Sequence, residues 1–176
     1  RTAFNLLGPL SNPANVKNQL VGVFSIEYLD RLPLLLKRKG AKNVMTVRSD
    51  DGMDEFSTSA TNRVCILRND KVLMNAIDPE VVGLHKSKLS DIQISTKQDA
   101  IESFVGVLNN TANQAMIETT VLNAAGGLIV GNIVDNFEEG VELALKTIKD
   151  GKAIALLEKF VADTGDSTKL KEINNG

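Results

Sequence analysis

The chain has 176 residues, of which 43% are hydrophobic and 24% charged, a composition typical of an ordinary globular protein with enough sequence for one core. Its 20 Lys and Arg residues nearly balance 22 Asp and Glu residues, which argues against the broad basic field that recruits nucleic acid or an anionic membrane. One cysteine excludes an internal disulfide, and we expect no membrane span or secretion signal and a reducing, cytoplasmic location. Because the sequence begins with Arg1 rather than Met, we expect a longer parent chain.

The first third of the chain predicts a strand, a helix and a second strand. Residues 19–24 (QLVGVF) and 43–48 (NVMTVR) are short apolar runs typical of strands buried on both faces. Between them lies a helical pattern that ends at Gly40, and Pro33 should kink this helix or start a second one because it lacks a backbone donor. One side of the helix is apolar at Ile26, Leu29, Leu32 and Leu36. A right-handed crossover of this kind implies that the two strands pair in parallel.

A polar segment and a hairpin are expected next. Residues 50–62 are acidic and contain glycine, and they follow a parallel strand at the end where loops commonly carry ligands. Residues 63–68 and 71–77 read as two strands joined tightly through Asn69 and Asp70. Asp78-Pro79 suits a helix cap followed by a first helical residue.

The rest of the chain is predicted to be helical. Ser95 and Gln98 match a capping box, and the helix that they open ends at Asn109-Asn110. Further helices are expected over residues 113–130, 137–149 and 152–162. Residues 1–162 are therefore expected to form one partial α/β domain, and residues 163–176 a polar tail that frays because it has little to bury.

The opening segment, residues 1–14 (RTAFNLLGPLSNPA), is the most distinctive stretch. Its prolines, glycine and asparagines predict a rigid, irregular turn, because Pro fixes its own backbone angle while Gly permits angles that other residues avoid. For an arbitrary sequence, such a stretch is simply a connection between elements.

A second constellation lies at residues 51–57 (DGMDEFS). Adjacent carboxylates on a loop after a strand suit a hard divalent cation, because Mg²⁺ prefers oxygen ligands and is commonly held by one or two carboxylates and substrate phosphates. By composition alone, a solvated acidic turn is the favoured interpretation, because Asp-Gly is common in turns.

Three further residues are assigned structural roles. His85 has no acidic or serine partner near it in the sequence, so it is not predicted to be catalytic. Cys65 lies in an apolar strand and is expected to fill the core. Asn123 lies in an apolar helix, where its amide is expected to bond a neighbouring loop or helix end.

The two constellations resemble the signatures of the anthranilate phosphoribosyltransferase family. Residues 1–13 match its first signature, and residues 51–57 match its second, Asp-Gly-x-Asp-Glu-x-Ser. The resemblance implies the carboxy-terminal part of the catalytic α/β domain shared by nucleoside phosphorylases and phosphoribosyltransferases, with a mainly parallel sheet, a hairpin and flanking helices. It implies that Asp54 and Glu55 hold a magnesium ion bound with phosphoribosyl pyrophosphate.

The same resemblance implies a reaction and its partners. The family transfers phosphoribosyl from phosphoribosyl pyrophosphate to anthranilate in tryptophan biosynthesis, and no catalytic Ser, Cys or His is required because the anthranilate amine is already a nucleophile. Pro9 is the candidate for lining the anthranilate channel, and Asn5 and Asn12 for fixing the turn around it.

The resemblance also implies that an amino-terminal half is missing. In the family that half carries a helical dimer-forming domain and a glycine-rich phosphate-binding loop, and neither is recognisable here, so the fragment is expected to be inactive alone and the full-length enzyme to be a homodimer. Two alternatives remain at this point. One is a pyrimidine nucleoside phosphorylase, which carries a similar Gly-Pro-Leu turn, and the other is a non-catalytic binding relative, although the acidic balance argues against nucleic acid as its ligand.

Overall fold

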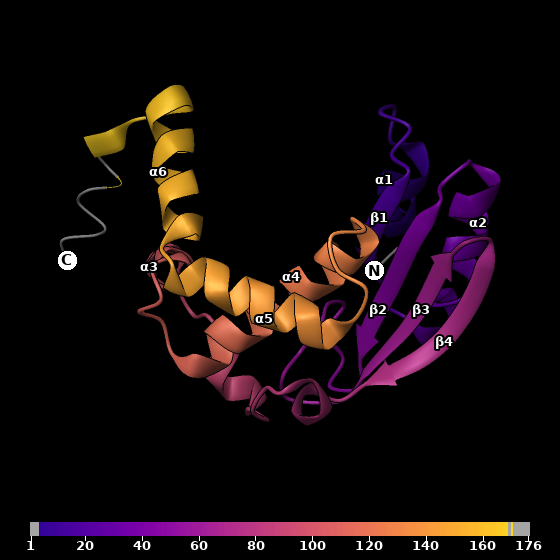
Figure 1. Ribbon diagram of the computed structural model, residues 1–176, viewed down its shortest axis with the longest axis horizontal. Coiled ribbons are helices and arrows are strands. Elements are labelled where there is room, and N and C mark those ends of the chain that lie inside the picture. The colour runs from indigo at the N-terminus through magenta and orange to yellow at the C-terminus, as the bar shows by residue number, and fades with distance from the viewer. Residues whose placement is uncertain (1–3, 169, 171–176) are drawn as a thin grey trace.

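A four-stranded sheet with helices on both faces forms the body of the protein (Figure 1). The computed structural model describes residues 4–168 and 170, without the side chains of residues 4 and 5. The strands are β1 (Asn18–Gly22), β2 (Asn43–Ser49), β3 (Asn62–Arg68) and β4 (Lys71–Ile77). The helices are α1 (Phe4–Ser11), α2 (Arg31–Arg38), α3 (Lys97–Leu108), α4 (Gln114–Val130), α5 (Phe137–Lys149) and α6 (Lys152–Thr164). Short 3₁₀ turns are η1 (Ile26–Tyr28), η2 (Pro79–Val82) and η3 (Leu89–Ile92).

The sheet has the order β1-β2-β3-β4 and is mixed. The expected parallel pairing of β1 with β2 is confirmed, with Asn18 opposite Asn43 and Gly22 opposite Val47. The expected hairpin is confirmed as well, and its left-handed turn residues Asn69 and Asp70 have φ angles of 51° and 62°. The α/β class is confirmed. Within this chain the sheet is not mainly parallel, because β3 runs antiparallel to β2.

Two cores lie on opposite faces of the sheet, because successive side chains of a strand point to opposite sides. Met45 and Val47 of β2 pack with α4 and α5, whereas Val44 packs with α2. The strand β2 is therefore buried on both faces, as its apolar run predicts. The strand β1 is only half-buried, because it lies at the edge of the sheet.

Local signals place several element ends correctly. Pro33 lies in the first turn of α2 after the separate turn η1, as expected for a residue that starts a second helix. Asp78 caps η2 by accepting the N–H of Glu80 at 3.1 Å. The apolar stripe is wrong at one position, since Ile26 is 52% exposed in η1 while Leu29, Leu32 and Leu36 are buried.

Two expectations about helix starts are corrected. The cap of α3 is Thr96 with Asp99, one residue after the expected Ser95 and Gln98, because Thr96 accepts the N–H of Asp99 and Asp99 accepts that of Thr96. The opening segment is not an irregular turn throughout, since residues 4–11 form α1 with Pro9 inside it. Packing of Leu6 and Leu10 against the α2 core offsets the hydrogen bond that Pro9 cannot make.

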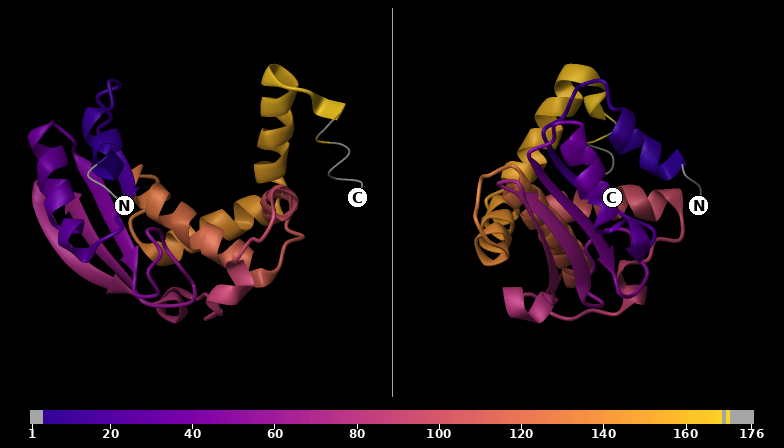
Figure 2. Two further views of the ribbon diagram at one scale, coloured as in Figure 1. Left: turned by 180° about the vertical axis from the view of Figure 1, so that it is seen from behind. Right: turned by 90° about the vertical axis from the view of Figure 1, so that its right-hand side faces the viewer.

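The helices α4 and α5 lie side by side across one face of the sheet, and α6 leaves the far end of α5 (Figures 1 and 2). Gly140 permits the close crossing, because a Cβ there would lie 2.8 Å from the Cβ of Ala125. No helix within the described ranges is both long and apolar enough to cross a membrane.

Candidate functional site

The acidic loop, residues 50–61, connects the carboxyl end of β2 to the start of β3. Backbone hydrogen bonds close both of its ends, from Ser49 N to Met53 O at 3.0 Å and from Asp50 N to Thr61 O at 2.9 Å. Gly52 adopts φ 101°, a conformation that side chains with a Cβ rarely take. The loop is therefore a closed turn at the carboxyl end of the parallel pair, the end at which α/β folds commonly bind ligands.

Asp51 organises the loop from within. Its carboxylate accepts the N–H of Met53 at 3.0 Å and the hydroxyl of Ser59. Burial alone would raise the pKa of Asp51, but hydrogen bonds from Ser57, Ser59 and Met53 outweigh it and hold this pKa below its ordinary value. Asp51 is thus ionised and engaged in holding the turn.

Hydrogen bonds from buried side chains fix the second half of the loop. Asn62 accepts the N–H of Ser57 at 2.8 Å and donates to the carbonyl of Ser57 at 2.9 Å. The Thr58 hydroxyl lies 2.7 Å from that of Thr119 and 2.8 Å from that of Ser87. Hydrogen bonds therefore hold the loop to β3, to α4 and to the segment that follows η2.

Asn123 of α4 clamps the centre of the loop. Its side-chain oxygen accepts the N–H of Phe56 at 3.1 Å, and its amide nitrogen donates to the carbonyl of Phe56 at 2.7 Å and to that of Thr119 at 2.9 Å. This confirms the expectation that the Asn123 amide bonds a neighbouring loop. The residue held is the one immediately after Glu55.

Two glycines let the loop approach the sheet and α4. A Cβ on Gly22, at the end of β1, would overlap the carbonyl oxygen of Asp54. A Cβ on Gly126 would lie 2.7 Å from the ring of Phe56, which is fully buried and packs edge-on against Phe137 with ring centroids 5.4 Å apart. The positions of Asp54 and Glu55 thus depend on contacts from both sides.

Asp54 and Glu55 are exposed, and no Lys or Arg within the described ranges forms an ion pair with either. Although Glu55 is exposed, its carboxylate is partly desolvated beside the hollow, and this desolvation, together with the negative charges of Asp54 and Asp51, raises the pKa of Glu55 above its ordinary value. Among the described residues the pair therefore has no compensating positive charge in contact with it, and its oxygens are ligands that Mg²⁺ prefers. These residues fit a magnesium ion.

The described residues offer too few neighbouring ligands for a complete metal coordination sphere. Over residues 4–168 and 170, no group of three or more His, Cys, Asp or Glu side chains is placed to hold a metal ion. Mg²⁺ usually keeps several waters and completes its sphere with substrate phosphates, so one or two carboxylates are a sufficient protein contribution.

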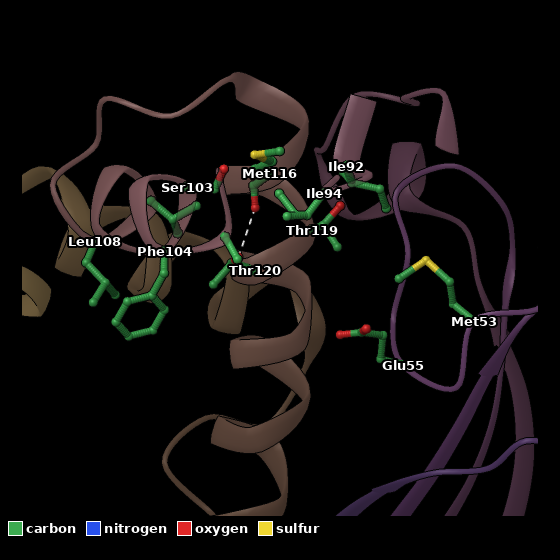
Figure 3. A pocket seen from close by; sticks show the side chains of 12 residues that line it. Met53, Glu55, Ile92, Ile94, Ser103, Phe104, Leu108, Met116, Thr119 and Thr120 are labelled. Carbon is green, nitrogen blue, oxygen red and sulfur yellow. Dashed lines mark hydrogen bonds between the residues drawn. The ribbon is translucent and has the colours of Figure 1, made fainter. Parts of the chain in front are cut away.

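A hollow of about 300 Å³ lies beside Glu55 (Figure 3). The acidic loop contributes Met53 and Glu55 to one side of it, and the Glu55 carboxylate points toward α4. The rest of the lining is largely apolar and comes from α3, α4 and the segment before α3, including Ile92, Ile94, Phe104, Leu108 and Met116. Negative charge and apolar surface therefore meet at one place.

The structure does not bring the opening segment to this hollow. Pro9 and Asn12 line a separate small pocket with Gln19 and Lys39, at the amino end of β1, whereas the acidic loop lies at the carboxyl ends of the parallel strands. Asn12 fixes a turn by accepting the N–H of Ala14 at 2.9 Å. Asn5 lies in α1, and its side chain is outside the described residues.

His85 and Cys65 have structural surroundings. His85 has an acidic partner that is distant in sequence, since its Nδ1 lies 2.8 Å from the buried carboxylate of Glu118, which also accepts the His85 N–H at 2.7 Å. This contact anchors the segment after η2 to α4. Cys65 fills the core as expected, and burial, with a smaller effect of Asp30, raises its pKa to about 11.

Sequence reasoning missed the roles of Gly22 and Asp51. A glycine inside an apolar strand run can signal the close approach of another backbone, so Gly22 carried a usable signal. Asp51 carried none, because only the folded loop distinguishes it from its acidic neighbours.

Replacing Asn123 by alanine is expected to lower the free energy of unfolding by about 2–4 kcal/mol, because it leaves the N–H and the carbonyl of Phe56 without their partner. The measurement is urea denaturation of the chain. Asn109→Ala, at the exposed end of α3, is the control and should cost far less. Equal losses in the two variants would contradict a clamp at Asn123.

The chain is similar in sequence and in structure to known proteins. The sequence profile of the "Glycosyl transferase family, a/b domain" matches residues 1–154. A curated anthranilate phosphoribosyltransferase from Nitrosopumilus maritimus is 86% identical over 176 residues, and the chain spans about half of its length, 51%. The crystal structure of the Thermus thermophilus enzyme of that name superposes with a TM-score of 0.82 at 32% sequence identity. The match covers 92% of this chain and 47% of the Thermus thermophilus chain.

The Saccharomyces cerevisiae enzyme of the same name has been solved in complex with PRPP and Mg, and also with 4-fluoroanthranilate. These two structures have TM-scores of 0.76 and 0.75 at 25% identity, and each covers 92% of this chain and 47% of its own.

Proposed function

We propose, from the premise that this chain belongs to the glycosyl transferase family defined by its a/b domain, that it is the carboxy-terminal half of an anthranilate phosphoribosyltransferase. The observation that carries the proposal is the 86% identity over the whole chain to a curated enzyme of that name. The exposed Asp54 and Glu55, which form no ion pair with a Lys or Arg of the described residues and lie beside an apolar hollow, support it from the structure.

The proposed reaction forms one bond and breaks one at the anomeric carbon of the ribose. The amine nitrogen of anthranilate attacks that carbon, pyrophosphate leaves with the bonding electron pair, and the nitrogen releases a proton. Asp54 and Glu55 would hold Mg²⁺ together with the phosphates of phosphoribosyl pyrophosphate, and the ion supplies neutralisation of the charge that grows on the leaving group.

The chain's own residues position the two carboxylates of the acidic loop. Asn123, Gly22 and the internal bonds of Asp51 fix the acidic loop before a ligand arrives, so the two carboxylates need not reorganise as charge develops. The apolar lining of the hollow at Glu55 gives the site one apolar side. The remaining phosphate contacts are assigned to the half of the relatives' length that this chain does not span.

Several further features belong to this proposal. The complete enzyme is a cytoplasmic homodimer, and nucleic acid is not a ligand. Pro9 lines the anthranilate channel, with Asn5 and Asn12 supporting it, and this role requires that the complete enzyme bring α1 closer to the acidic loop than this chain does alone.

Joining this chain to the missing half of the Nitrosopumilus maritimus relative tests the proposal. We expect the joined protein to convert anthranilate to phosphoribosyl anthranilate in a magnesium-dependent way, followed by loss of anthranilate fluorescence, and this chain alone to show no turnover. The added half by itself is the control. A folded joined protein that leaves anthranilate unchanged would contradict the proposed function.

A further inference from the structure

The helix α6 carries an apolar face that the rest of the described chain does not cover. None of its residues is fully buried, and Leu156 and Phe160 are 69% and 62% exposed. Gly151, with φ 70°, turns the chain sharply out of α5, so α6 stands away from the sheet at the opposite end of the molecule (Figures 1 and 2). An amphipathic helix of this kind is normally packed on its apolar side.

The exposed face of α6 continues into the candidate site. A groove of about 550 Å³ is lined by Leu156 and Phe160 together with Leu108 at the end of α3. Leu108 also lines the hollow at Glu55, next to Phe104, which is 56% exposed. We call this continuous strip of Phe104, Leu108, Leu156 and Phe160 the α3–α6 surface. Exposed apolar strips of this kind mark interaction surfaces.

We infer that the α3–α6 surface is covered by a polypeptide segment, namely the half that the relatives have and this chain does not span. The chain covers 51% of the Nitrosopumilus maritimus relative and 47% of the Thermus thermophilus structure, so each of these relatives has a segment of similar length that this chain does not span. The inference rests on the proposed function, under which that segment brings phosphate donors to Glu55. A segment that reaches Glu55 from the open side of the hollow lies over Phe104 and Leu108.

A second copy of this chain is the rival occupant. It would cover the same apolar side chains, but it would bring no new phosphate-binding sequence to Glu55, because it carries only the residues already present. The continuity of the surface with the site therefore favours the missing half over a second copy.

Thiol labelling of Leu156→Cys tests the inference. The native Cys65 is fully buried and its pKa is raised to about 11, so it stays silent toward a maleimide at neutral pH. With serine in place of any cysteine in the added half, we expect labelling of Leu156→Cys in the joined protein to be at least tenfold slower than in this chain alone. Glu158→Cys is the matched control, because a residue two positions away on a helix points to nearly the opposite side, and its labelling should be unchanged.

Two outcomes of the labelling experiment overturn the inference. One is equally fast labelling of Leu156→Cys in the joined protein and in this chain alone. The other is protection in this chain alone that grows with protein concentration to the level seen in the joined protein, which assigns the surface to a second copy.

Association of the two halves as separate polypeptides gives a second readout, measured by sedimentation. Phe160→Lys should weaken the complex at least tenfold, whereas Ala162→Lys, an exposed position outside the groove lining, should not. Equal affinities for the two variants would count against the inference. Protection and association without turnover would reject only the proposed function, and turnover with an unprotected residue 156 would reject only the docking surface.

Discussion

Replacing Asp54 by asparagine and Glu55 by glutamine together is expected to lower the turnover of the joined, full-length enzyme about a hundredfold. Mg²⁺ supplies several kcal/mol of transition-state charge stabilisation, and each 1.36 kcal/mol corresponds to a factor of ten in rate. Both substitutions keep the size of the side chain but remove the negative charge that the cation requires. The measurement is the rate at saturating substrates as a function of magnesium concentration, with the half-maximal concentration expected to rise at least tenfold.

The paired substitution Asp135→Asn with Glu138→Gln is the control, because it removes the same charge from exposed carboxylates near the start of α5. Its turnover and its magnesium dependence should match those of the parent. Binding of Mn²⁺, followed by electron paramagnetic resonance, separates loss of the metal from loss of the fold. Unchanged metal binding in the Asp54 and Glu55 variant would show that the ion is held elsewhere.

Replacing Gly22 by alanine is expected to lower the free energy of unfolding by about 1–3 kcal/mol and to displace the acidic loop. The added methyl group would overlap the carbonyl oxygen of Asp54, which is backbone and cannot rotate away as a side chain would. The loop must therefore move with both of its carboxylates. We expect weaker Mn²⁺ binding by the joined protein together with a lower urea midpoint.

Gly127→Ala is the matched control for Gly22→Ala. A Cβ at residue 127 would meet nothing within 4 Å, and Gly127 is exposed in the last turn of α4. Alanine is favoured over glycine in a helix by about 0.5–1 kcal/mol, so this variant should be slightly more stable and bind metal normally. A Gly22→Ala protein as stable as Gly127→Ala would refute the close approach of Asp54 to β1.

The sequence alone identified the elements whose signals are local. The turn Asn69-Asp70 predicts the hairpin because both residues tolerate positive φ, and the bounds of α5 agree with its apolar spacing between Asn136 and Gly151. The acidic pair Asp54-Glu55 was recognisable as a candidate cation site because its carboxylates are adjacent and follow a strand. In each case, the residues that decide the outcome lie within a few positions of one another.

Only the tertiary structure decided how these parts are held. α1 forms despite Pro9, because Leu6 and Leu10 pack against α2, and packing outweighs one missing backbone hydrogen bond. The acidic loop is fixed by Gly22 and Asn123, which lie far from it along the chain, and no local pattern encodes a contact between such distant positions. The sequence therefore determined which side chains are candidates to bind a cation, while long-range packing determined where they stand and which apolar surface they border.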